Sequence, residues 1–183
     1  MISRAVMLVV LAAVLTPLGL AAAKTSRHTG HVATCARQSG ASFPQAFTRR
    51  ANLVVGPLSM IGAGRATSRA TVEEFGGNKF PVLVRAGHTV TIELSRRANR
   101  SASLFYAIGS GGALTQTRVR DGHRVVTFRA CSERRSRSDA DGDPVTFWSG
   151  FVVVSEPMCV QLKVWIDEEP ASRRTRIALG RRC

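Results

Sequence analysis

The chain of 183 residues carries 26 lysines and arginines against 12 aspartates and glutamates, a formal net charge of +14, and aromatic side chains make up 6% of it. This length suits one domain with a hydrophobic core of its own. The arginines are scattered, with few aromatic side chains between them to stack on bases, which argues against specific nucleic-acid binding. The positive charge favours either a solvated basic surface or weak attraction to an anionic cell envelope.

Residues 1–23 have the features of a secretory signal peptide. Arg4 precedes an apolar run, and the alanines at 21–23 supply the small side chains that a signal peptidase requires. We therefore expect a secreted or otherwise extracytoplasmic protein that begins near Lys24. A retained membrane anchor is the alternative, although the run is shorter than the roughly 20 residues of a spanning helix. No later segment of the sequence approaches that length, so we expect no transmembrane segment in the mature chain.

Residues 24–50 are expected to form a poorly defined N-terminal segment, whereas 51–183 have the short, β-branched segments of an all-β domain. Alternation is clearest at 89–94, where apolar side chains take every second position. A short helical turn is predicted at 69–75. The other predicted strands are 32–36, 53–61, 80–85, 103–108, 145–154, 159–166 and 173–180.

The strongest local turn signal is Asp121–Gly122, between apolar segments at 114–120 and 123–130. Asp-Gly suits the two positive-φ positions of a type I′ turn, so we predict a hairpin in which Arg120 faces His123. Roughly eight or nine strands of this kind favour an antiparallel β-sandwich as a single domain. Its topology is expected to be immunoglobulin-like or jelly-roll, with a closed barrel as the alternative.

Four cysteines in an exported chain are expected to form two disulfides. Cys159 begins one predicted strand, and Cys183 follows the strand that returns beside it, so we predict the pairs Cys159–Cys183 and Cys35–Cys131. The alternative connectivity joins Cys131 to Cys159 and Cys35 to Cys183.

The C-terminal part of the chain resembles a group of small secreted proteins from actinobacteria, over roughly residues 53–183. The matching segments are 79–87 (KFPVLVRAG), 126–131 (VTFRAC), 147–152 (FWSGFV), 159–162 (CVQL) and 179–183 (LGRRC). The resemblance implies export and a shared fold, and it implies no activity.

Two patterns could be taken for metal sites, and neither is specific. His28 and His31 precede Cys35 with suitable ligand chemistry, but that cysteine is better used in a disulfide. Carboxylates alternate over 139–143 as in calcium loops, but Pro144 cuts the pattern short, and a solvated loop is expected. We therefore expect no metal and no cofactor.

Four further side chains have chemistry that suits catalysis or binding. His88 and His123 lie at predicted turns with no partner at catalytic spacing, so neither is expected to support hydrolysis. Trp148 and Trp165 alternate onto the faces opposite the predicted core, which makes both candidates for a binding surface.

These observations favour an exported, non-enzymatic β-sandwich that acts as a binding or structural module of the envelope or extracellular space, with no ligand indicated. A secreted hydrolase with an unrecognised site is one alternative. A secreted inhibitor or effector, which would use exposed loops such as 132–143, is another.

Overall fold

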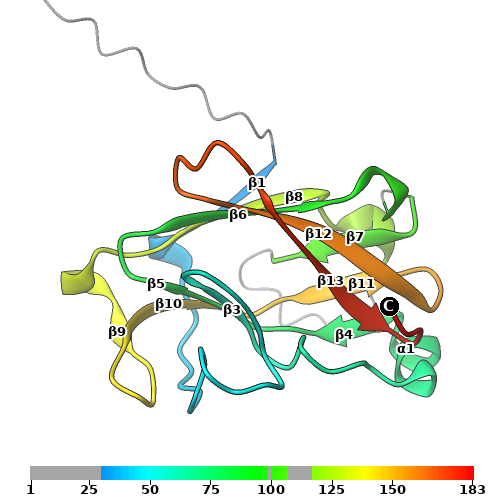
Figure 1. The fold of residues 1–183 in the computed structure, drawn as a ribbon, viewed down its shortest axis with the longest axis horizontal. Helices are drawn as coiled ribbons and strands as arrows, with labels where there is room; N and C mark the ends of the chain where they lie inside the picture. Colours follow the sequence, from blue (N-terminus) through cyan, green and yellow to red (C-terminus); the bar gives the residue numbers. More distant parts are fainter. Residues whose placement is uncertain (1–29, 99, 107–116) are drawn as a thin grey trace, which may run out of the picture.

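The computed structural model describes residues 30–98, 100–106 and 117–183, which form an all-β domain and confirm the predicted fold class. Three sheets are present, with the strand orders β1-β8-β6-β12-β13 (the first sheet), β2-β3-β5-β10-β9 (the second sheet) and β4-β11-β7 (the small sheet). Figure 1 shows β6, β8 and β12 of the first sheet along the upper side, with β3, β5, β10, β4 and β11 on the opposite side. The bounds are β1 His31–Thr34, β2 Leu53–Val55, β3 Leu58–Met60, α1 Arg69–Phe75, β4 Gly77–Lys79, β5 Val82–Arg85, β6 Thr89–Leu94, β7 Ala102–Phe105, β8 Val125–Arg129, β9 Arg137–Ser138, β10 Pro144–Trp148, β11 Phe151–Val154, β12 Met158–Ile166 and β13 Arg173–Leu179.

The main core lies between the sheets, and the alternating strands supply it. Along β12, every second side chain from Val160 to Ile166 is buried, as the alternation predicts. The ring of Phe128 packs against Tyr106 edge to face and against Trp148 at 5.2 Å between centroids. Burying each such side chain contributes roughly 1.5–3 kcal/mol.

A second apolar cluster covers the outer side of the second sheet. Ala46, Leu83, Val145 and Phe147 are buried there, with Phe43 packed against them. The part of the N-terminal segment around Phe43–Phe47, for which the sequence predicts little structure, therefore packs onto the sheet.

Both predicted disulfides are present. Cys35–Cys131 joins the end of β1 to the end of β8, and these two strands pair in parallel. Cys159–Cys183 ties the end of the chain to β12. Cys159 lies opposite Ala178 in the hairpin, and the residues after Gly180 span the remaining distance to Cys183.

The predicted helical turn is α1, and its ends explain its length. The Ser68 hydroxyl accepts a hydrogen bond from the Thr71 amide at 3.0 Å and caps the start. Gly76 adopts a φ of 67° and ends the helix in the left-handed conformation that glycine favours.

The predicted long strand over 145–154 is two strands in two sheets, separated at Ser149 and Gly150. A Cβ on Gly150 would collide with the Tyr106 ring, so the chain passes close to this ring as it changes sheets. The break depends on a contact between distant parts of the chain, which a strand pattern does not reveal.

The predicted Asp121–Gly122 hairpin is wrong. Residues Val119–Asp121 form a short 3-10 turn, in which the Asp121 carboxylate accepts a hydrogen bond from the Arg118 amide at 2.9 Å. Gly122 is extended, with φ −100° and ψ −175°, whereas a type I′ turn needs positive φ. A Cβ at this glycine would collide with Ser103, so close approach to β7 explains the residue. Part of the predicted partner strand, 114–116, lies outside the described residues.

Candidate functional site

A cavity with a volume of about 670 Å³ lies where the segment 117–124 crosses β7 and β11. We call it the arginine pocket because four arginine side chains line it, together with Ser103, Val153 and neighbouring residues. The four are Arg100, Arg118, Arg120 and Arg124. Its volume is in the usual range for sites that take small organic ligands.

Backbone pairing holds one wall of the arginine pocket in place. The amide of Leu104 donates to the carbonyl of His123, and the amide of His123 donates to the carbonyl of Leu104, both at 2.8 Å. Gly122 and Arg124 flank this histidine and both line the cavity. The wall is therefore fixed to β7 although it is not itself part of a named strand.

Positive charge is incompletely balanced at this cavity. Arg124 lies 3.4 Å from the Glu93 carboxylate, and Arg120 lies 3.8 Å from Asp121, whose other oxygen accepts the backbone hydrogen bond described above. Among the described residues, no carboxylate forms an ion pair with Arg100 or Arg118. Guanidinium groups present several donors in a planar fork that matches phosphate and carboxylate oxygens.

The floor of the arginine pocket contains a buried hydroxyl. Ser103 is only 3% exposed, and its Oγ has no hydrogen-bond partner in the described part of the molecule. Burial of an unpaired hydroxyl costs free energy that a ligand oxygen at this place would recover. The residue pairs with Val153 of β11, which is also buried.

A second cavity, of about 430 Å³, lies over β12 and β13. We call it the strand pocket. Lys163, Arg174 and Arg176 supply its charges, and Gln161 and Ser95 are among its polar side chains. It is therefore cationic as well.

His123 and His31, which the sequence places far apart, stack on each other with ring centroids 4.7 Å apart and planes 12° apart. Burial lowers the pKa of His31, and the nearby His123 and Arg37 lower it further, whereas a hydrogen bond from the ring to the Tyr106 backbone raises the pKa in opposition. The third member of the predicted metal pattern, Cys35, is in a disulfide, and His28 lies outside the described residues. In the described ranges no three histidine, cysteine or acidic side chains are grouped to hold a metal ion.

His88 has a partner that sequence spacing did not reveal. Its Nδ1 lies 2.7 Å from Oδ2 of Asp167, whose Oδ1 accepts a hydrogen bond from the Thr89 amide. Both side chains are about two-fifths exposed, and neither described cavity includes them. Within the described part of the chain, no hydroxyl or thiol is hydrogen-bonded to the His88 ring. The pair joins two turns of the first sheet.

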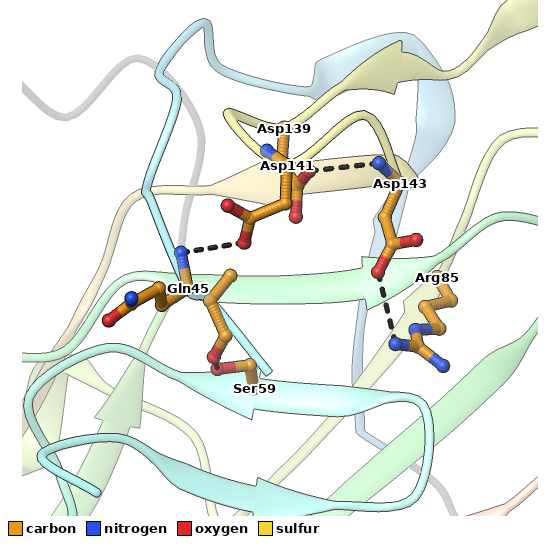
Figure 2. Close-up of polar contacts among 7 residues, drawn as sticks. Gln45, Ser59, Arg85, Asp139, Asp141 and Asp143 are labelled. Atoms are coloured by element: carbon orange, nitrogen blue, oxygen red, sulfur yellow. Dashed lines mark hydrogen bonds and ion pairs between the residues drawn. The ribbon is translucent and has the colours of Figure 1, made fainter. Parts of the chain in front are cut away.

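The acidic loop, residues 139–143, is a structural element rather than the solvated loop that we expected (Figure 2). Asp139 is 6% exposed, and its Oδ1 accepts hydrogen bonds from the amides of Asp141 and Asp143, each at 2.9 Å. Asp141 accepts a hydrogen bond from the Gln45 amide at 2.6 Å, and Asp143 pairs with Arg85 at 3.0 Å. The carboxylates thus turn toward different partners, and Oδ2 of Asp139 has none among the described groups.

The two tryptophans differ in environment. Trp148 is 2% exposed and belongs to the main core, so the prediction that it lies on an outer surface is wrong. Phe147, its neighbour, points to the outer cluster instead, because both sides of this strand are covered. Trp165 is half-buried on the outer face of β12, opposite Thr91 of β6, as the alternation predicts. Its role in binding stays a prediction.

Comparison with known proteins identifies no relative: no family model, curated protein or solved structure matches the chain. Nor does the described part of the molecule contain a helix with the length and hydrophobicity needed to cross a membrane.

The arginine pocket is the feature that sequence reasoning missed. Its arginines come from two separate segments, at Arg100 and over 117–124, and only the close spacing of Arg118, Arg120 and Arg124 offered a signal.

Proposed function

We propose that this protein is an exported, non-enzymatic binding module of the envelope or extracellular space, whose arginine pocket takes a phosphate-bearing ligand. The features of a signal peptide at 1–23 and the two disulfides support export to an oxidising compartment. The resemblance to small secreted actinobacterial proteins supports the same location.

One observation carries the assignment of the ligand class. Four arginines surround one cavity, and two of them, Arg100 and Arg118, have no carboxylate partner in the described chain. Hydrogen bonds from guanidinium to phosphate are charge-assisted and stronger than neutral ones.

A titration of tripolyphosphate followed by calorimetry tests this proposal. The double variant Arg100→Gln/Arg118→Gln is expected to lower affinity by about tenfold or more, because each lost charge-assisted contact is worth roughly 1.5–3 kcal/mol. The matched control is Arg134→Gln/Arg135→Gln, which removes the same charge from an exposed turn that lines neither cavity. Equal loss of affinity in both variants would show that only net charge matters and would contradict the proposal.

The secreted hydrolase remains the second candidate because of the hydrogen bond between His88 and Asp167. A histidine held by a carboxylate is two thirds of a hydrolytic triad, and the missing part is a nucleophile. We expect His88→Ala to leave any measured activity of the protein unchanged. A large loss of hydrolytic rate in this variant would move the enzyme to first place.

A secreted inhibitor that uses the loop 132–143 has less support. The acidic half of this loop is bound to Gln45 and Arg85 of the domain, which leaves the exposed basic turn Glu133–Arg135 as the part without such contacts. A protein bound by such an inhibitor would therefore have to contact this short turn.

A further inference from the structure

The two cationic cavities adjoin each other, and one carboxylate oxygen lies between them. Oε1 of Glu93 is 3.4 Å from Arg124 of the arginine pocket and 3.7 Å from Lys163 of the strand pocket. Two cations that share one oxygen at these distances are themselves close neighbours. The Glu93 side chain is 15% exposed, so it is more deeply buried than the side chains of Arg124 and Lys163.

Strand register extends this contact into a row across the first sheet. Glu93 of β6 lies opposite Lys163 of β12, which in turn lies opposite Arg174 of β13. On the other side, Glu93 lies opposite Val125, the residue after Arg124. Side chains at paired positions project from the same face of a sheet, so Glu93, Lys163 and Arg174 form a continuous line. Arg124 joins this line through its ion pair with Glu93 rather than through strand register.

The line continues into the strand pocket. Gln161 lies opposite Arg176, and the carbonyl of Gln161 accepts a hydrogen bond from the Ser95 amide at 3.0 Å. With strands about 4.8 Å apart, the row from β8 to β13 covers roughly 14 Å. A single phosphate group cannot reach both ends of such a row, whereas a chain of several can.

Building on the anion binding proposed above, we infer that the arginine pocket and the strand pocket are the two ends of one site for a linear polyanion that carries phosphate groups along its length. The arginine pocket holds one group of phosphates, and the strand pocket holds another on the same chain. The Glu93 carboxylate lies next to Arg124 and Lys163, between the two ends. Simultaneous contact raises affinity because the second contact is intramolecular.

The lining of the two cavities favours phosphate groups over bases. No aromatic side chain lines either described cavity, so a nucleic acid would find backbone contacts without the stacking surfaces that single-strand binders use. The site therefore fits a polymer recognised through its anionic groups, such as a phosphate-containing polymer of the cell envelope.

Chain length is the variable that tests this inference. Affinity for tripolyphosphate and for long-chain polyphosphate, expressed per phosphate at one salt concentration, is measured for the full mature chain. We expect the long chain to bind at least about tenfold more tightly. The variant Arg174→Gln/Arg176→Gln is expected to remove this advantage and to leave tripolyphosphate binding unchanged, with Arg134→Gln/Arg135→Gln as the control of equal charge and thermal unfolding as the check of folding.

The outcomes separate the two proposals. If tripolyphosphate binds but the Arg174→Gln/Arg176→Gln variant keeps the long-chain advantage, the joined site is wrong and the arginine pocket stands. If tripolyphosphate does not bind the unaltered protein, the proposed function itself is wrong. An oligodeoxythymidine with the same number of phosphates is expected to bind no more tightly than polyphosphate. Much tighter binding of that strand would overturn the inference in favour of a nucleic-acid site.

Discussion

Strand β8 connects two charged regions that use their charges in opposite ways. Before its start, Arg124 borders the arginine pocket, where cations outnumber carboxylates. After its end, Cys131 leads toward the acidic loop 139–143, where each carboxylate accepts hydrogen bonds or an ion pair from the domain itself. The number of charges is similar in the two regions, and what separates them is whether the protein supplies the partners.

This difference separates a structural cluster from a candidate site. A charge that the fold already neutralises has little left to offer a ligand, and its removal damages the fold. A charge without a partner costs the fold little to lose, and its removal damages binding. Substitutions in the two regions should therefore affect stability and affinity in opposite ways.

The largest expected effect is the loss of stability on removal of the disulfide at the end of β8. Replacing both cysteines of the Cys35–Cys131 disulfide with serine removes a cross-link that closes a loop of 96 residues and should lower the free energy of unfolding by about 4–5 kcal/mol in the chain-entropy model. The same change at Cys159–Cys183, with a separation of 24, should cost only about 3 kcal/mol. Urea unfolding of the two variants measures this order, and a reversed order would contradict it.

The next effect concerns the acidic loop. Asp139→Ala should lower the free energy of unfolding by about 2–3 kcal/mol, because it removes a buried carboxylate that accepts two backbone hydrogen bonds. Asp141→Ala removes an exposed acceptor and should cost about 1 kcal/mol or less. Both variants should bind tripolyphosphate as the unaltered protein does. Weakened binding in Asp139→Ala, at a temperature where the variant is folded, would break the division between the two regions.

Glu93→Gln sharpens the comparison from the other side. It removes the carboxylate next to Arg124 and Lys163, so polyphosphate should bind a few-fold more tightly, with a steeper dependence on salt. Calorimetric titration at two salt concentrations measures the change. Weaker binding would show that Glu93 positions the two cations more than it competes for them.

The smallest expected effect is a dependence of stability on pH that comes from His31 of β1, beside the start of β8. The pKa of His31 is lower in the folded state than its ordinary value of 6.5, so the folded protein binds fewer protons than the unfolded chain. Stability from this group is therefore present above about pH 6.5 and is lost as the pH falls through the folded-state pKa. His31→Gln should reduce the loss of stability between pH 7.5 and pH 5 in urea unfolding. An unchanged pH profile would assign that loss to other groups.

Sequence patterns predicted those parts of the fold that depend on neighbouring residues. The alternation in β12 and the helical turn α1 follow from local spacing, and the Cys159–Cys183 disulfide follows from the hairpin of the last two strands. The Cys35–Cys131 disulfide, across 96 residues, follows as the remaining pair. The break between β10 and β11 could not be predicted, because the need for Gly150 comes from the distant Tyr106 ring. Gly122 misled the prediction for a related reason: close packing against Ser103, rather than a turn, explains it.

The candidate site was harder to predict than the fold. The four arginines of the pocket are a small part of a basic chain, and scattered arginines look alike until strand order brings some together. The alternation places Trp148 on an outer face only if one side of its strand is covered. In the structure both sides are covered: Trp148 lies in the main core, and segment 43–47 covers the side of Phe147. Sites built from turns on several strands give only a weak signal in sequence.

The central claim is that anions bind where the protein leaves cations without partners. An NMR titration of isotope-labelled protein, residues 24–183, with tripolyphosphate tests it most directly, because every amide reports separately. We expect chemical-shift changes at Ser103, Arg118 and Gly122, which line the arginine pocket, and none at Asp141 in the acidic loop. Changes of equal size at every exposed arginine, including Arg134 and Arg182, with no preference for the pocket, would contradict it.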